Sequence, residues 1–329
     1  MKILHISFHR GCQNDIQYVC DKLGLTLEFM EFDDGITKSN AKYNVGYKRA
    51  NDCWNKYSDY FNSFDIVITS DTAPISRVFL QNNFSKKLII WICNRFDYAD
   101  QASNDCRFPD KDYYDLIRDA KSRPNVIIAG YTPFENYYAN NIRNVNIGDL
   151  IIKPLGGISN VYNNFTESDI PNKSEKFFVP PYHNDTIMMN LAEKLTSLGI
   201  QNHNGRYNGP LDLAKFKGVV HIPYAWSNLA LFEGLSLGIV YFVPEKNFLI
   251  NIKKDKDFFW SPPYREDVLE LSEWYNPELA EILVYFSSWE DLKFKTDNLN
   301  YTEQKNKMKI FIEKHQEKYF NIWKQIILN

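Results

Sequence analysis

The alternation of short apolar runs with amphipathic stretches constrains the fold of this chain more than any other feature. Apolar runs at residues 1–8, 64–71 and 86–94 are separated by stretches with helical spacing, such as residues 14–24. Parallel strands need long crossover connections, and helices usually supply them. The run at 86–94 is apolar almost throughout, which is typical of a strand buried on both faces. The first half of the chain is therefore predicted to form a doubly wound parallel α/β sheet.

The alternation lapses near residues 148–175, where glycines, a proline and a polar cluster predict a linker at 156–175. A second alternating set follows at 176–302. Because 329 residues are too many for one ordinary core, we expect two Rossmann-like domains, the first at 1–155. Residues 303–329 are predicted to form one long helix from the spacing of their apolar side chains. These side chains are Met308, Phe311, Ile312, Tyr319, Trp323 and Ile326.

Charge and composition exclude several classes of partner. The formal net charge of −3 does not favour nucleic acid as a partner. No apolar run approaches the roughly 18 residues of a membrane-spanning helix, although peripheral membrane contact stays open. The first residues lack the pattern of a signal peptide, and the five cysteines form no C-x-x-C pair. We therefore expect a reduced, cytoplasmic protein, with its oligomeric state undetermined.

The second domain contains an unusual carboxylate between residues 218 and 245. After the run GVVHIPY the chain turns, and Ser227 is a suitable N-cap for the next helix. The amides of Ser227, Asn228 and Leu229 would then form an anion site suited to a diphosphate. Glu233 lies about a turn and a half further on, in an apolar stretch where an unpaired carboxylate is costly. It either accepts hydrogen bonds from two adjacent hydroxyls, as on a ribose, or lies at the domain surface.

The segment LAKFKGVVHIPYAWSNLALFEGLSLGIVYFVPE (213–245) resembles the nucleotide-sugar-binding segment of GT-B glycosyltransferases of group 1. In that class a strand, a loop, a helix containing E-A-x-x-x-G and a short strand ending in proline recur in this order. The helix motif is EGLSLG here, so the resemblance implies that Glu233 holds the nucleotide ribose. It also implies two domains facing across a cleft, with the helix at 303–329 crossing back to the first domain.

The resemblance further implies the chemistry. The donor would be a nucleotide-diphosphate sugar, the acceptor a hydroxyl of a glycan, glycolipid or glycoprotein, and neither a cofactor nor a metal would be needed. Many retaining members carry a second glutamate eight residues earlier, where this chain has Ala225, so the stereochemical outcome stays open. A nucleotide-sugar epimerase of the same architecture and a non-catalytic carbohydrate- or nucleotide-binding protein are the alternatives.

Further donor-side candidates follow two predicted strands of the second domain. The run FVPPYHND replaces the Gly-Arg turn that is usual in the class, and its Tyr182, His183 and Asn184 are candidates for the donor site. A solvated loop position is the alternative for His183. Arg206 is a candidate phosphate clamp because its planar fork suits phosphate oxygens, although a plain surface arginine is equally consistent with the sequence.

The candidate bases lie in the first domain. A glycine-containing loop after the first strand carries His9, Arg10 and Gly11, and a histidine has a pKa near working pH. Asp71 ends the strand at 64–71, where it is either a base or a residue that shapes the turn and caps the next helix. For inverting chemistry we expect the base to be His9, Asp71 or Asp97, in that order.

The acceptor is expected to bind beside the strand at 86–94. That strand delivers polar side chains together at its carboxyl end, which suits sugar recognition. These residues are Asn94, Arg95, Asp97 and Tyr98. A direct ion pair between Arg95 and Asp97 is the alternative. The run AGYTPFENYY after the following strand adds Tyr131, Thr132 and Glu135 to the same wall.

Overall fold

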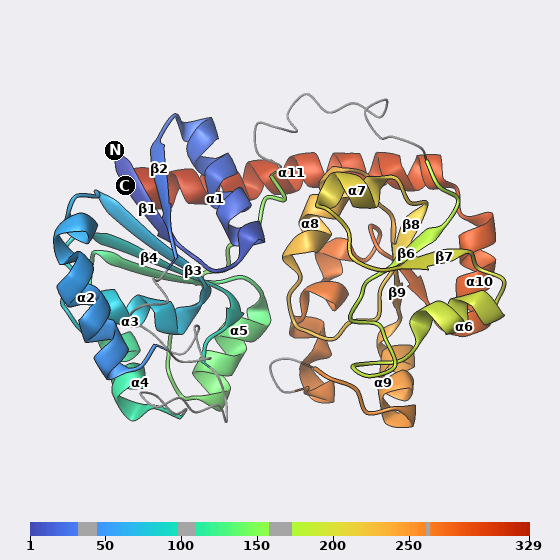
Figure 1. Cartoon of the computed structure of the whole chain (residues 1–329), viewed down its shortest axis with the longest axis horizontal. Helices are drawn as coiled ribbons and strands as arrows, with labels where there is room; N and C mark the ends of the chain where they lie inside the picture. The colour runs from blue at the N-terminus through green and yellow to red at the C-terminus, as the bar shows by residue number, and fades with distance from the viewer. Residues whose placement is uncertain (32–44, 98–108, 158–172, 261–263) are drawn as a thin grey trace. The chain divides into compact units, whose positions relative to one another are not determined.

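The computed structural model describes residues 1–31, 45–97, 109–157, 173–260 and 264–329. The chain forms two compact units. Unit 1 comprises Met1–Pro154 and Tyr319–Asn329, and unit 2 comprises Leu155–Lys318. Each unit contains a five-stranded sheet with helices around it (Figure 1). The predicted linker at 156–175 falls largely outside the described residues.

The sheet of unit 1 is entirely parallel, with the order β2-β1-β3-β4-β5. Its strands are β1 (Lys2–Ile6), β2 (Thr26–Met30), β3 (Ile66–Thr72), β4 (Lys87–Arg95) and β5 (Val126–Gly130). Its helices are α1 (Arg10–Leu23), α2 (Tyr47–Asn62), α3 (Arg77–Leu80), α4 (Lys111–Ala120) and α5 (Pro133–Tyr137). The chain steps one way from β1 to β2 and the other way from β3 onward. This reversal creates a topological switch point between β1 and β3, where ligands of doubly wound sheets bind.

Right-handed crossovers place α1 on one face of this sheet and α2, α3 and α4 on the other (Figure 1). The end of α11 (Tyr301–Leu328) covers the same face as α1, because Lys22 lies over the ring of Phe320. Trp323 of α11 packs edge-on against Trp91 of β4, with ring centroids 5.3 Å apart. Lys87 also donates to the carbonyls of the last turn of α11, at 3.2 and 3.3 Å.

Helix α11 confirms the long helix predicted at 303–329. Its buried apolar residues are Met308, Ile312, Tyr319, Trp323 and Ile327. Two of the residues predicted for this apolar face, Phe311 and Ile326, are only half-buried. The helix belongs to unit 2 up to Lys318 and to unit 1 from Tyr319 onward.

Unit 2 repeats the topology of unit 1 with shorter strands. Its parallel sheet has the order β10-β9-β8-β6-β7, which places the switch point between β6 and β8. The strands are β6 (Phe177–Val179), β7 (Asn202–Asn204), β8 (Gly218–Val220), β9 (Tyr241–Pro244) and β10 (Val284–Phe286). Besides α11, the helices are α6 (Leu191–Ser197), α7 (Pro210–Ala214), α8 (Leu229–Ser236), α9 (Lys246–Asp255) and α10 (Trp289–Asn298).

Helix α8 connects β8 to β9, so its amino end lies at the carboxyl edge of the sheet. The N-cap is Asn228 and not the predicted Ser227, because the helix begins one residue later than expected. At its other end Gly238 follows the C-cap Leu237 with a φ of 69°, in the left-handed region that glycine adopts readily. The Ile239 N–H donates to the Gly234 carbonyl at 2.9 Å, which completes a Schellman motif.

Gly156 packs directly on this helix. Its φ is 64°, and a Cβ atom there would lie 2.3 Å from the backbone oxygen of Phe232. Gly238 has a similar φ of 69°, but a Cβ atom would meet nothing nearer than 3.8 Å. The two glycines therefore separate the cost of backbone strain from the cost of a clash with α8.

We expect Gly238→Ala to lower the free energy of unfolding by about 1–2 kcal/mol, from left-handed strain alone. Gly156→Ala should cost about 1–3 kcal/mol more, because α8 must shift to admit the methyl group. Urea unfolding of both variants would measure the difference. Equal losses would show that Gly156 does not hold α8 in place.

Candidate functional site

A buried histidine that follows β6 lies at the switch point of unit 2. His183 is fully buried, and its Nε2 lies 2.8 Å from the N–H of Ile222 just beyond β8. The same Nε2 lies 2.9 Å from the Ile222 carbonyl oxygen, so this ring nitrogen faces both backbone polar groups of Ile222. Burial lowers the pKa of His183 to about 4. The alternative of a solvated loop histidine is therefore wrong: the ring joins the ends of two strands.

Aromatic rings surround this histidine. His221, also buried, lies 4.8 Å from the His183 ring and stacks on Trp274 at 4.2 Å between centroids. Tyr224 contacts both histidines. Tyr182 lies beside Tyr224, with centroids 5.6 Å apart, yet remains 53% exposed. An exposed ring thus rests on a buried aromatic layer, where a ligand ring can stack on it.

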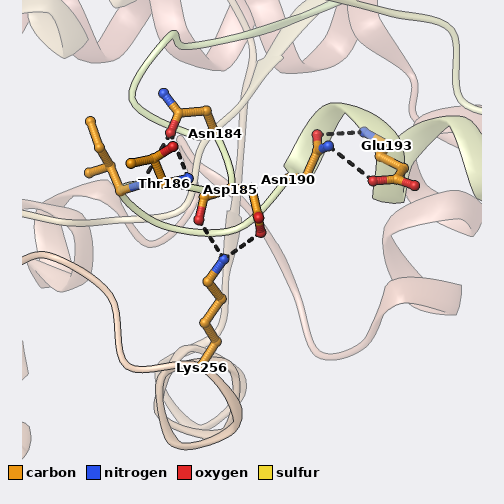
Figure 2. A network of polar contacts seen from close by, with 7 residues as sticks. Asn184, Asp185, Thr186, Asn190, Glu193 and Lys256 are labelled. Carbon is orange, nitrogen blue, oxygen red and sulfur yellow. Dashed lines mark hydrogen bonds and ion pairs between the residues drawn. The ribbon is translucent and has the colours of Figure 1, made fainter.

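Asn184 shapes the loop that carries these rings (Figure 2). Its Oδ1 accepts from the N–H groups of Thr186 and Ile187 at 3.0 and 3.1 Å. Lys256 then fixes the loop by donating to the backbone oxygen and to Oδ1 of Asp185, at 2.7 and 2.6 Å. The predicted contact between Asn184 and a donor stays a prediction, because this side chain is engaged in a turn.

Glu233 is half-buried on α8. Burial, followed by the charge of Glu233, raises the pKa of Tyr207. Burial, followed by Tyr207 and then by Glu233, raises the pKa of Tyr241 well above its usual value. The Tyr241 hydroxyl donates to the carbonyl of Ala230 at 3.2 Å, which ties β9 to the first turn of α8. Glu233 therefore occupies a partly enclosed position from which its charge acts on two tyrosines.

Glu273 is a site residue that the sequence analysis missed. It is fully buried, and its Oε2 accepts from the N–H of Asn228 at 2.8 Å. Its own N–H donates to the carbonyl of Trp226 at 2.9 Å. No motif surrounds it, and the 45 residues that separate it from Asn228 hide the contact from any local pattern.

This contact changes the predicted anion site. The Asn228 amide already has an acceptor, whereas the amides of Leu229 and Ala230 have none among the described residues. These two are the first helical N–H groups of α8, so they point out of its positive end. Arg206 is exposed and forms no ion pair within the described part of the chain. Unit 2 thus has two amides without acceptors at the start of α8 and, separately, an exposed guanidinium after β7.

In unit 1, His9 follows β1 and caps α1. Its Nδ1 accepts from the Gly11 N–H at 3.1 Å, while the side chain stays exposed. The neutral ring then carries its proton on Nε2, so its lone pair is not available to a substrate. Arg10, also exposed, donates to Gln13 at 3.3 Å. His9 in this position is a hydrogen-bond donor more than a base.

Asp71 lies at the switch point of unit 1, at the end of β3. Its φ is 74°, which is uncommon outside glycine, and the pairing of β3 with β4 shifts register directly after it. Its Oδ1 accepts from Asn94 at 3.2 Å, and the short helix that follows has Thr72 as its N-cap. Burial, followed by the charge of Cys12, raises the pKa of Asp71 to about 7. A buried carboxyl group that titrates near neutrality is suited to proton transfer.

Asp97 instead belongs to a buried structural network. Its carboxylate accepts from the hydroxyls of Tyr114 and Tyr138, the latter at 2.9 Å. It also pairs with Arg143 at 2.7 Å. The alternative pairing with Arg95 is therefore wrong. These three partners occupy both oxygens of Asp97, which favours a structural role over that of a base.

The remaining acceptor candidates are either engaged in the structure or half-buried at the end of β4. Tyr131 is fully buried. Glu135 and Thr132 form a capping box at the start of α5, with Glu135 accepting from the Thr132 N–H at 2.8 Å. Asn94 and Arg95 are half-buried at the end of β4. Tyr98 lies outside the described residues.

The comparisons with known proteins show the fold. No protein-family model and no curated protein matches the sequence. Among solved structures, CalG4, the calicheamicin glycosyltransferase, matches with a TM-score of 0.50 at 9% identity, over 99% of this chain and 98% of that chain. This likeness confirms the predicted fold class, the two-domain α/β arrangement called GT-B.

Two further structures are similar to this chain. The wall teichoic acid polymerase TagF has a TM-score of 0.47 at 11% identity, over 99% of this chain and 88% of that chain. A UDP-N-acetylglucosamine 2-epimerase has a TM-score of 0.45 at 9% identity, over 94% of this chain and 90% of that chain. Within the described ranges no helix is long and apolar enough to cross a bilayer.

The buried histidines of unit 2 predict acid sensitivity. Burial holds the pKa of His183 and of His221 below the usual 6.5, so the unfolded chain binds more protons between the two pKa values. The contribution of the neutral histidines to the free energy of unfolding is fully present above pH 6.5 and is lost as the pH falls toward 4. Between pH 6.5 and 5 we expect the free energy of unfolding of the wild type to fall by about 2 kcal/mol more than that of His221→Phe.

Urea unfolding followed by tryptophan fluorescence at several pH values would measure this difference. His203→Gln is the control, because His203 is exposed. If His221→Phe and the wild type lose stability in parallel, the neutral aromatic layer does not govern the acid response.

Proposed function

We propose that this chain is a glycosyltransferase that moves a sugar from a nucleotide-diphosphate sugar to a hydroxyl of a carbohydrate-bearing acceptor. The observation that carries the proposal is the construction of α8: two amides without acceptors at its amino end and a half-buried carboxylate at Glu233 on the same helix. The GT-B fold shared with CalG4 supports it at the level of fold only.

Unit 2 would hold the donor. The diphosphate would accept hydrogen bonds from the amides of Leu229 and Ala230, where the helix dipole favours negative charge. Glu233 would accept from the two ribose hydroxyls, and Arg206 would balance the charge of the leaving diphosphate. Tyr182, exposed above its aromatic layer, would stack on the base.

Unit 1 would activate the acceptor, and Asp71 is the preferred base. The acceptor hydroxyl would give its proton to the Asp71 carboxylate while its oxygen bonds to the anomeric carbon. The bond to the diphosphate oxygen would break in the same step, and the nucleoside diphosphate would leave with the electron pair. The Nδ1 lone pair of His9 already accepts from the Gly11 N–H. His9 would therefore donate a hydrogen bond through Nε2 and would not serve as the base.

Glu233 offers a direct test of the donor site. We expect nucleoside diphosphates to raise the Tm of the wild type, and Glu233→Gln to weaken their binding about tenfold to a hundredfold, because one charged acceptor is lost. Glu245→Gln, an exposed glutamate just after β9, is the control and should bind as the wild type does. A wild type whose Tm responds to no nucleotide would contradict the proposal.

The Asp71 assignment makes a separate prediction for turnover. Because the base must be deprotonated, kcat should rise with pH through about 7 and level off above it. Asp71→Asn should lower kcat by about 10²- to 10⁴-fold with little change in donor KM. His9→Asn, which keeps a helix-capping side chain, should lose far less. The assignment fails if Asp71→Asn is active while His9→Asn is not.

The same assays separate the alternatives. A nucleotide-sugar epimerase would release or interconvert the sugar without any acceptor. A non-catalytic binding protein would show the Glu233-dependent affinity with no turnover at all.

A further inference from the structure

Two asparagine–glycine pairs flank Arg206 in the segment that follows β7. They are Asn204-Gly205 and Asn208-Gly209. An asparagine before a glycine is prone to deamidation, because the glycine nitrogen can approach the side-chain carbonyl with no Cβ atom in the way. Both asparagines are exposed, so exposure alone does not distinguish them. Their backbone setting and their hydrogen bonds do.

Asn204 is held in place by the sheet. It is the last residue of β7 and pairs with Val179 of β6. Its Nδ2 donates to the carbonyls of Val179 and Pro180, at 3.4 and 3.3 Å. Deamidation requires the next backbone nitrogen to turn back toward the side chain, whereas the extended backbone of a strand turns it away. The strand and the two hydrogen bonds therefore protect this amide.

Asn208 has neither form of protection. It lies in no strand or helix and directly precedes Gly209, the N-cap of α7. Among the described residues its carboxamide has no hydrogen-bond partner, and the Gly209 N–H has none either. The Asn208 N–H donates to Oδ2 of Asp212 at 3.0 Å, but neither reacting group takes part in that bond. The side-chain carbonyl and the nitrogen that would attack it are thus both available.

Tyr207 anchors the chain between the two exposed side chains. Its ring packs edge-on against Phe178 of β6, with centroids 5.5 Å apart. Arg206 before it and Asn208 after it stay exposed. A negative charge created at position 208 would therefore lie two residues from the candidate phosphate clamp, on an anchored part of the chain.

We propose that Asn208 deamidates spontaneously in the folded protein. The Gly209 nitrogen attacks the side-chain carbonyl carbon of Asn208 and forms a C–N bond, which closes a cyclic imide. The C–N bond of the carboxamide breaks, and the proton of the Gly209 nitrogen leaves with the amide group as ammonia. Water then opens the imide at either carbonyl and gives aspartate or isoaspartate. In sum one amide and one water give one carboxylate and one ammonium ion.

The new carboxylate would oppose an anion at the candidate donor site, and this consequence rests on the proposed function. Asn208→Asp carries the aspartate product from the start, whereas Asn208→Gln keeps a neutral amide that cyclises far more slowly. We expect inorganic pyrophosphate to bind Asn208→Asp about threefold to tenfold more weakly than Asn208→Gln, because a like charge repels it. Equal affinities would show that residue 208 does not act on the phosphate site. Pyrophosphate needs no base, sugar or acceptor, so this result is separate from turnover.

The deamidation itself is tested by peptide mass mapping of the full-length protein after several days at neutral pH and physiological temperature. Trypsin places the two pairs in separate peptides, 195–206 and 207–215. We expect peptide 207–215 to convert progressively to its aspartate and isoaspartate forms, while Asn204 in peptide 195–206 keeps its amide. A sample digested before the incubation corrects for deamidation during digestion.

Two controls make the map decisive. In the chain unfolded in urea the strand and its hydrogen bonds are lost, so both peptides should deamidate at similar rates. In folded Asn208→Gln the change in peptide 207–215 should disappear. The proposal is overturned if peptide 207–215 of the folded wild type keeps its amide, or if peptide 195–206 of the folded protein deamidates equally fast.

Discussion

Parallel hydrogen bonding in both sheets is the constraint on which the rest of the structure depends. Each strand pairs only with parallel neighbours, so every connection must return along a helix or loop to the opposite edge. Both sheets also reverse their winding direction once, between β1 and β3 and between β6 and β8. That reversal gathers residues from distant parts of the chain at one edge. His183 thereby meets Ile222 across the reversal in unit 2, and the neighbouring strands β3 and β4 bring Asp71 to Asn94.

The two switch points carry different chemistry on the same topology. In unit 1, burial raises the pKa of Asp71 to about 7, which suits proton transfer. In unit 2, the buried rings of His183 and His221 lie beside each other beyond the strand ends, and α8 carries two amides without acceptors and the half-buried Glu233. The proposed division into an acceptor-activating unit and a donor-holding unit follows from this difference.

The order of strands and helices was predictable because each apolar run is contiguous in the sequence and its length identifies the element. The long helix at the end follows an equally local rule, the spacing of its apolar side chains. What escaped prediction depends on contacts between distant residues. Glu273 caps the turn before α8 from 45 residues away, and Asp97 finds Arg143 in place of Arg95. Local patterns predicted the strands and helices that carry these residues but not the partners of each side chain.

The donor site rests on one claim, that Glu233 recognises a ribose whose phosphates lie at the amino end of α8. Calorimetric titration of the wild type with a nucleoside diphosphate and with its 2′,3′-dideoxy counterpart tests this claim most directly. The two ligands share base and phosphates and differ only in the hydroxyls that Glu233 would bind. We expect the dideoxy form to bind about tenfold to a hundredfold more weakly. Equal affinities would contradict the assignment of Glu233 and the donor site built around it.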